Sequence, residues 1–305
     1  MIKLLARILM ICATSGALLA QTRSGPLTRH YVEGEKLTYH MKGINESWHY
    51  EIQADGIVKK GPDGTYYEDY GWSNLISNGQ MDPLSGPALN LRQQVSLDPN
   101  RPPSMPDLSQ GPKIVGPITD LMTFYVDVWM AARTDKLMKP GDHVYLKLGT
   151  PSSWADGVRV LQGDSSIDFD FTLREINQKA GTVTLIARHV PPEQTQLKLP
   201  AEWMRKPVAG APNNWVTVEK TRDGKFLGAV GKEVFDVEIK LSLADGKILS
   251  VTMDNPVVTI ERECSDQTLT NCGDPRSHTI RRQIEMSLVH PAGNLGTSDA
   301  PGPQL

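Results

Sequence analysis

Three residues near the beginning of the chain have side chains that could support acid–base or metal chemistry. His40 and His49 lie on two neighbouring segments that alternate apolar and polar residues, and Glu51 follows His49 by two positions. Alternate residues of a β-strand point to the same face, so all three fall opposite the aromatic residues. A cross-strand His–Glu pair can move a proton or hold a metal. A solvated outer face contains the same residue types, and we favour that interpretation; a hydrolase-like enzyme remains an alternative.

Two further patterns have weaker chemical meaning. Asp164, Asp168 and Asp170 could bind Ca²⁺, but they lack the glycine-containing loop that wraps such an ion, so we interpret them as a polar strand face. Residues 228–233 read Gly-Ala-Val-Gly-Lys-Glu, with the wrong glycine spacing for a phosphate loop and Glu233 in place of the hydroxyl that meets Mg²⁺. The sequence also lacks G-x-S-x-G and His-Glu-x-x-His patterns. We therefore expect no catalytic residues, no metal and no cofactor.

Binding of an apolar molecule is an alternative to chemistry. The chain is rich in aromatic and methionine residues at positions that we expect to face inward, and methionine adapts to irregular ligands and to irregular cores alike. Such residues either pack against one another or line a groove. The candidates for the groove are Tyr39, Met41, Trp48, Tyr50, Phe124, Tyr125, Val128, Trp129, Phe169 and Phe171.

One segment has a clear helical pattern. Its apolar residues recur at three- and four-residue spacing from Leu121 to Ala132, which predicts a helix over residues 119–136. Thr119 is the expected cap, and Asp120 stands where a negative charge favours the helix dipole. Pro140 and the glycine after it prevent continuation. The broad apolar stripe has to be covered by something large.

The rest of the chain reads mainly as strands that are apolar on one face. They are predicted at residues 35–43, 47–53, 143–148, 167–173, 182–187, 215–220, 235–241, 248–253, 257–260 and 279–288. Five Asp-Gly pairs, at 55–56, 63–64, 156–157, 223–224 and 245–246, predict tight hairpin turns. The expected fold is mainly β: a large curved antiparallel sheet, or half-barrel, with one long helix packed on its concave face.

Composition indicates one domain with two long connections. Proline-rich segments at 78–117 and 191–212 exclude long strands and helices, and long connections of this kind are either functional lids or unstructured. Residues 291–305 contain too little apolar surface to order themselves, which predicts a disordered tail. No internal repeat or composition shift divides the remainder, so we expect a single domain over residues 21–290.

The beginning of the chain has the layout of a secretory signal peptide. Lys3 and Arg7 precede an apolar run that ends at Ala20, so residues 1–20 are expected to be removed. The mature chain then has 32 − 2 = 30 basic and 35 acidic residues, a net charge of −5, which argues against nucleic acid as a partner. No other segment approaches the roughly 18 apolar residues of a membrane span. These features predict a periplasmic or secreted protein.

The two cysteines of the mature chain predict a disulfide. Cys264 and Cys272 bracket a polar loop between strand-like segments. An even pair in an exported protein is typical of a structural disulfide, and the spacing fits neither a redox motif nor a zinc site.

Two short motifs resemble a known family. Gly-Glu-Lys-Leu-Thr-Tyr at 34–39 opens the first strand, and Leu-Met-Lys-Pro-Gly-Asp at 137–142 leads from the helix into a strand. This order resembles a family of bacterial periplasmic proteins of unknown function. The resemblance implies a half-barrel similar to lipoprotein-carrier proteins and an exported location, and it implies no site residues.

The sequence therefore supports three functional hypotheses. The leading one is an exported, non-catalytic β protein that binds or carries a lipid or acyl chain in the groove between sheet and helix. The first alternative is a structural or protein-interaction module of the cell envelope that uses an open sheet edge and the proline-rich connections. The second is the enzyme around His40, His49 and Glu51.

Overall fold

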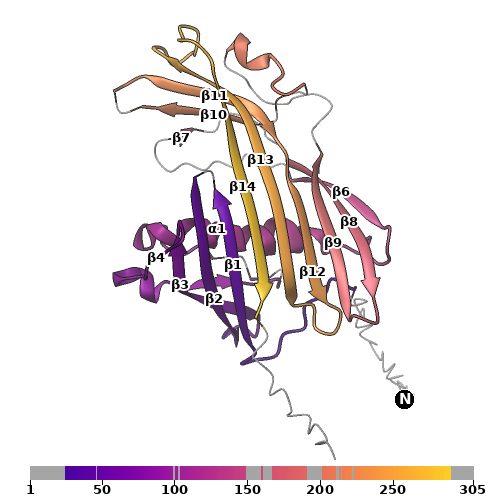
Figure 1. The fold of residues 1–305 in the computed structure, drawn as a ribbon. Coiled ribbons are helices and arrows are strands. Elements are labelled where there is room, and N and C mark those ends of the chain that lie inside the picture. The colour runs from indigo at the N-terminus through magenta and orange to yellow at the C-terminus, as the bar shows by residue number, and fades with distance from the viewer. Residues whose placement is uncertain are drawn as a thin grey trace, which may run out of the picture.

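The structure is a computed structural model that describes residues 25–45, 47–98, 100–101, 104–148, 159–160, 167–190, 201–210, 213, 215–221 and 223–289. These residues form a large antiparallel sheet that is not closed, with one long helix across one face (Figure 1). The predicted fold class is confirmed. The predicted leader, the tail, the 156–157 turn and residues 191–200 of the second connection lie outside the described residues.

Fourteen strands make up the sheet within the described part of the chain. They are β1 (Lys36–Asn45), β2 (Trp48–Lys60), β3 (Tyr66–Ser77), β4 (Gln80–Met81), β5 (Gln93–Val95), β6 (His143–Leu148), β7 (Arg159–Val160), β8 (Ile167–Asn177), β9 (Thr182–Val190), β10 (Trp215–Lys220), β11 (Phe226–Glu233), β12 (Asp236–Ser242), β13 (Ile248–Cys264) and β14 (Arg276–Leu288). The main order is β4-β3-β2-β1-β14-β13-β12-β9-β8-β6. Consecutive strands mostly pair with each other, as the predicted meander requires.

The strands β13 and β14 are long enough to join two hydrophobic cores. The first half of β13 pairs with β12 up to Asp254, and the second half pairs with β11 from Val257. Pro256 stands at this change of partner, where a residue without an N–H is tolerated. In Figure 1, β10 and β11 lie beside the far ends of β13 and β14, away from the helix. The smaller core there consists of Ala201, Met204, Val208, Val216, Val218, Val230, Cys264 and Leu269.

The long helix begins earlier than predicted and changes its winding. It is continuous from η3 (Pro112–Ile114) through α1 (Val115–Met122) and the π-helical segment η4 (Thr123–Met130) to Ala132. The predicted start at Thr119 and end at 136 are wrong. Pro117 falls in the first turn of α1, where the missing N–H would have no intrahelical partner in any case. Thr119 therefore lies inside the helix, and its hydroxyl donates to the Gly116 carbonyl (2.8 Å).

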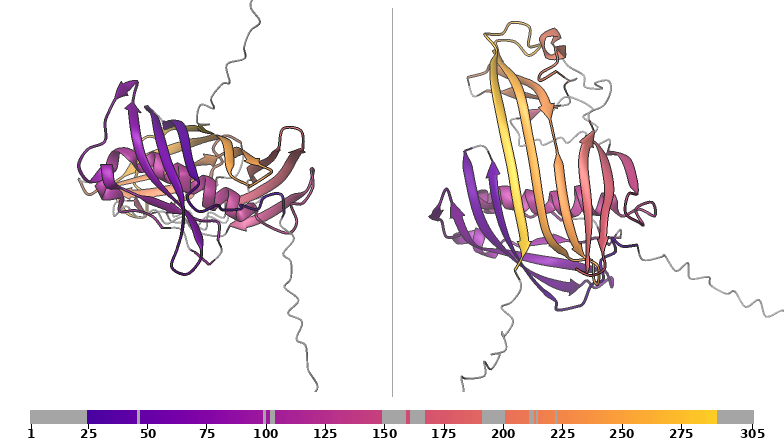
Figure 2. Two further views of the ribbon diagram at one scale, coloured as in Figure 1. Left: turned by 90° about the horizontal axis from the view of Figure 1, so that it is seen from below. Right: turned by 45° about the vertical axis from the view of Figure 1, so that its right-hand side comes forward.

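The larger core lies between this helix and the sheet. Figures 1 and 2 show the helix crossing behind the long strands, on the face opposite the one that Figure 1 presents. The helix buries its apolar stripe completely, at Ile118, Leu121, Phe124, Tyr125, Val128, Trp129 and Ala132. The inward residues of β1 alternate with half-exposed or exposed ones, which matches the predicted one-sided pattern. The sheet thus has a helix face and an outer face.

The Asp-Gly turns were predicted correctly at three positions and wrongly at one. Gly64, Gly224 and Gly246 have positive φ values in the turns after β2, β10 and β12. Asp55 and Gly56 instead lie inside β2, paired with Thr38 and Leu37. The Tyr70 ring occupies the space beside Gly56, since a Cβ there would lie 2.4 Å from Cε1 of Tyr70. This glycine therefore serves side-chain packing within a strand and not a turn.

The first proline-rich connection contains short elements and, at its end, the start of the long helix. The short elements are η1 (Gly86–Asn90), η2 (Leu108–Gln110), η3 and the short strands β4 and β5, and α1 begins at Val115. The expectation that residues 78–117 exclude a long helix is therefore wrong for residues 112–117. The second connection contributes η5 (Glu202–Arg205) to the smaller core. Strand β3, β11 and the extension of β13 to Cys264 were not predicted. In β11, residues 228–233 are extended strand, in agreement with the rejection of a phosphate loop.

The predicted disulfide is present between Cys264 and Cys272, with the sulfur atoms 2.04 Å apart. It closes the loop that follows β13, and the loop residue Leu269 is buried in the smaller core. Among the described residues, the helices are all too short or too polar to cross a membrane.

Candidate functional site

Two large cavities lie on opposite faces of the sheet. The outer-face cavity has a volume of about 820 Å³ and extends across β1, β2, β3, β8, β9, β12, β13 and β14. The helix-side cavity has a volume of about 750 Å³ and lies between the β1–β2 hairpin end and the first turns of the helix. It is lined by Asn45, Trp48, Leu75, Ser77, Asp82, Pro112, Lys113, Val115, Gly116, Thr119, Asp120, Thr123 and Arg282.

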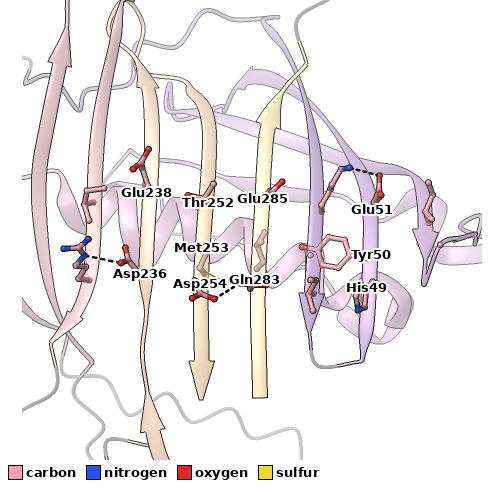
Figure 3. Close-up of a pocket in the computed structure, with 18 of the residues that line it drawn as sticks. His49, Tyr50, Glu51, Asp236, Glu238, Thr252, Met253, Asp254, Gln283 and Glu285 are labelled. Carbon is pink, nitrogen blue, oxygen red and sulfur yellow. Dashed lines mark hydrogen bonds and ion pairs between the residues drawn. The ribbon is translucent and has the colours of Figure 1, made fainter. Parts of the chain in front are cut away.

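The outer-face cavity is floored by a row of polar residues. Glu51, Lys42, Glu285, Thr252 and Glu238 stand directly opposite one another across five strands, from β2 to β12. Figure 3 shows the labelled members of this row on the sheet face away from the helix. Cross-strand neighbours of this kind interact through their side chains.

Ion pairs neutralise much of the charge in the outer-face cavity. They join Lys42 to Glu51 (3.5 Å), Arg174 to Glu238 (3.0 Å) and Arg188 to Asp236 (3.2 Å). Exposed pairs of this type contribute little stability. This surface matches the solvated outer face that we favoured from the sequence.

The proposed enzyme residues come together only in part. His40 Nε2 lies 3.4 Å from Glu51 Oε2, and both side chains are about 40% exposed. The His49 side chain makes no hydrogen bond or ion pair within the described residues, although its backbone N–H donates to Asn78 (2.8 Å). His40 and Glu51 therefore form an exposed pair, and His49 stands apart from them.

Trp48 forms the aromatic part of the wall of the helix-side cavity. The Trp48 indole packs over Gly116 of the helix, because a Cβ at Gly116 would lie 2.8 Å from its Cζ3 atom. The Trp48 Nε1–H donates to the Ser77 hydroxyl (2.9 Å), which fixes the ring beside the cavity. Leu75, Pro112 and Val115 extend this apolar surface.

The floor of the helix-side cavity is a partly buried ion pair. Asp120 comes from the helix and is 4% exposed, and Arg282 comes from β14 and is 26% exposed. The Nε and Nη2 groups of Arg282 both donate to Oδ1 of Asp120, the former at 3.1 Å. The Tyr50 hydroxyl donates to the other carboxylate oxygen, Oδ2, at 2.5 Å. Asp120 therefore fixes the guanidinium in place from one side.

Burial controls the protonation of this cluster. It raises the pKa of Asp120, although the Arg282 charge and the Tyr50 hydrogen bond oppose the rise. Burial and the Asp120 charge raise the pKa of Tyr50 well above its ordinary value, so Tyr50 remains a hydrogen-bond donor. Burial alone would lower the pKa of Arg282, but the neighbouring Asp120 outweighs it and raises that pKa.

Most of the predicted groove residues belong to the packed core. Tyr39, Met41, Tyr50, Phe124, Tyr125, Val128, Trp129, Phe169 and Phe171 are each at most 3% exposed. Of the predicted set, only Trp48 lines the helix-side cavity, and Tyr50 reaches its floor through Asp120. The side chains of the others pack against one another and against the sheet. Ligand contact by these residues stays a prediction.

A second buried polar cluster explains part of this packing. Arg29 Nε donates to Glu68 Oε1 (3.0 Å), and neither side chain is exposed. Tyr70 and Tyr125 donate to Glu68 Oε2 at 2.8 and 2.5 Å. Glu35 binds Arg29 Nη2 at 2.7 Å. Each of these groups has partners within the cluster, so we interpret it as structural.

Asp120 and Arg282 were not identified from the sequence as a pair. They lie 162 positions apart, and a local pattern does not connect such residues. One signal was present: Arg282 has the same strand parity as the apolar residues Ile280, Ile284 and Met286, so a charged side chain occupies an inward position. A charge at such a position indicates a buried partner.

Neither a metal-binding group among the described residues nor a similar protein indicates a function for this cavity. Within the described residues, no group of three or more His, Cys, Asp or Glu side chains could hold a metal ion. Comparison of the chain with protein-family models, with curated proteins and with solved structures found no match. The resemblance to periplasmic half-barrels therefore stays a prediction, and the helix-side cavity is the basis for a functional proposal.

Proposed function

We propose that this is an exported, periplasmic or secreted, non-catalytic protein that binds or carries an apolar molecule such as a lipid or acyl chain. The observation that carries the proposal is the cavity of about 750 Å³ between the sheet and the first turns of the helix. Its volume lies in the range of pockets that enclose small ligands.

The lining of the cavity favours a ligand with a large apolar part. Trp48 offers a half-exposed aromatic surface, and Val115 and Pro112 add aliphatic surface from the helix. Aromatic side chains bury a large area per residue, which makes Trp48 the main expected contact. The polar groups are concentrated at the floor, around Arg282.

The geometry of the floor favours binding over catalysis. A general base has to reach a proton of its substrate. Both oxygens of Asp120 already accept hydrogen bonds, from Arg282 and from Tyr50, and its side chain is almost entirely buried. The carboxylate is therefore better suited to position Arg282 than to act on a ligand.

Native mass spectrometry of protein isolated from the compartment to which it is exported tests the proposal. We expect a copurified apolar molecule and a mature chain that begins after Ala20. Val115→Trp should fill the cavity and lower ligand occupancy, whereas Leu89→Trp, at a position that is 61% exposed, should leave occupancy unchanged. Absence of a bound molecule, together with failure of added acyl compounds to bind, would refute the proposal.

One observation favours the alternative of a cell-envelope interaction module. The sheet is open, and among the described residues β6 pairs with β8 on one side only. An edge strand can accept a strand from a partner. Affinity capture with the wild type and with a variant carrying proline at Leu146 tests this: loss of a captured envelope protein in the variant would support the alternative, and equal capture would count against it.

A further inference from the structure

Arg282 occupies a position where a charged side chain is unfavourable unless it is paired. It lies on the helix face of β14, two residues from Ile284, which is 2% exposed. Taking a guanidinium out of water requires compensation by a partner and by hydrogen bonds. Asp120 provides the hydrogen-bonded partner on one side of the guanidinium, and Glu233 and Asp127 add electrostatic attraction.

The hydrogen-bond donors of Arg282 are only partly used. A guanidinium has five N–H donors, and two of them, on Nε and Nη2, point at Asp120 Oδ1. Within the described residues, Nη1 donates to no protein group. Arg282 also lines the helix-side cavity. The remaining donors are therefore available to a molecule in the cavity.

Both carboxylate oxygens of Asp120 at the same floor already accept hydrogen bonds. Oδ1 of Asp120 accepts from Arg282, and Oδ2 accepts from Tyr50. At the rim, Asp82 is paired with Lys113. Asp127 of the helix, which also interacts electrostatically with Arg282, accepts a hydrogen bond from Thr123. A ligand that reaches the floor therefore meets unused donors of Arg282 and carboxylates that already accept hydrogen bonds, an arrangement that favours a hydrogen-bond acceptor over a cation.

We propose that the ligand carries an anionic head group, a carboxylate or a phosphate, which Arg282 binds while the apolar part lies against Trp48. This inference rests on the proposed function, because it names the ligand class of the same cavity. Asp120 and Tyr50 act as positioning residues: Asp120 orients the guanidinium, and Tyr50 orients Asp120. Arginine matches both anions because its planar fork can donate two parallel hydrogen bonds to either.

Binding of single-chain amphiphiles of equal length to the full chain tests the proposal. The probes are an alkyl carboxylate, an alkyl phosphate, an alkyl alcohol and an alkylamine, with acetate and inorganic phosphate as head groups without a chain. We expect both anionic amphiphiles to bind roughly tenfold or more tightly than the alcohol, and the amine to bind most weakly.

Arg282→Gln should remove this preference and leave alcohol binding in place. Because that variant leaves Asp120 without its partner, the double variant Arg282→Gln/Asp120→Asn, which removes both charges, provides a second test with the same expectation. Arg281→Gln is the matched control, since Arg281 is the neighbouring residue on the exposed face of β14. It should keep the preference of the wild type.

The outcomes separate the inference from the proposed function. Equal binding of carboxylate, phosphate and alcohol, or a preference that survives in both Arg282 variants, would overturn the anionic head group and leave the apolar ligand intact. Binding of none of the amphiphiles would refute the proposed function. If acetate and phosphate bind as tightly as the amphiphiles, Arg282 is an anion site, and the apolar part of the proposal is wrong.

Discussion

The ring of Tyr50 covers Gly43, its directly opposed partner on β1: a Cβ atom added to Gly43 would lie 2.1 Å from Cε1 of Tyr50. Tyr70 covers Gly56 on β2 in the same way. An aromatic ring laid over a cross-strand glycine shields backbone that would otherwise be uncovered. Here it also aims each hydroxyl, that of Tyr50 at Asp120 and that of Tyr70 at Glu68.

Gly43→Ala should therefore disturb the floor of the helix-side cavity. The new methyl group has to displace the Tyr50 ring, and overpacking of this kind lowers the free energy of unfolding by about 1–3 kcal/mol. Urea denaturation measures the change. Gly273→Ala is the control, because its nearest contact would be an ordinary 3.8 Å, and its effect should be small. Equal stability of Gly43→Ala and wild type would show that Tyr50 has room to move.

Glu68→Gln should be among the most destabilising single substitutions. It removes the fully buried carboxylate that pairs with Arg29 Nε and leaves only Glu35 to balance that guanidinium, and breaking a buried pair from one side lowers the free energy of unfolding by roughly 3–5 kcal/mol. Glu238→Gln, which breaks solvent-accessible pairs with Arg174 and Lys240, should change the free energy of unfolding by less than about 1 kcal/mol. The prediction fails if the two variants have similar denaturation midpoints.

Asp120 should make stability depend on pH. Burial raises the pKa of Asp120 in the folded protein above the ordinary value of 3.8. At a pH between 3.8 and this raised pKa, the folded protein holds the proton and the unfolded chain has released it. The free energy of unfolding contributed by this group therefore falls as pH rises through that window, by at most about 1.4 kcal/mol per pH unit.

The measurement is the difference in unfolding free energy between wild type and Asp120→Asn, followed upward from about pH 4. Other carboxylates titrate in both proteins and cancel in the difference. We expect this difference to fall with rising pH. A rise would mean that Arg282 outweighs burial and lowers the pKa of Asp120.

Removal of the disulfide should weaken mainly the smaller core. Replacing both Cys264 and Cys272 by serine should lower the free energy of unfolding by about 2–3 kcal/mol, because a short closed loop is released in the unfolded chain. Hydrogen exchange should accelerate around Met204 and Leu269, which belong to the same core as Cys264. Uniform acceleration that includes Leu185 in the larger core would show that the two cores unfold together.

The sequence predicted the features that depend on local periodicity. The one-sided strands and the apolar stripe from Leu121 to Ala132 led to an open antiparallel sheet with a helix on one face, which the structure confirms. The start of the helix was missed because Pro117 was interpreted as a boundary, although the first turn of a helix accepts proline. Asp55 and Gly56 have the composition of a turn, but the Tyr70 ring keeps them in a strand.

The candidate site depended on pairings that periodicity does not reveal. The groove between sheet and helix was expected from the arrangement of the elements, and a cavity does lie there. Trp48 is the one member of the predicted set in its lining, and ligand contact by the other nine stays a prediction. Asp120 was interpreted through the helix dipole, whereas its environment comes from Tyr50 and Arg282 on two distant strands. Long-range partners of this kind become visible only when the register of the sheet is known.

The shared strands β13 and β14 restrict how the chain can change in length. Side chains alternate between faces along each strand, so one inserted residue near Pro256 would turn every later side chain of β13 to the opposite face. Cys264 would then leave the smaller core, while Val251 and Met253 stayed in the larger one. Viable insertions and deletions in this stretch of β13 should therefore come in twos, matched by equal changes in β14.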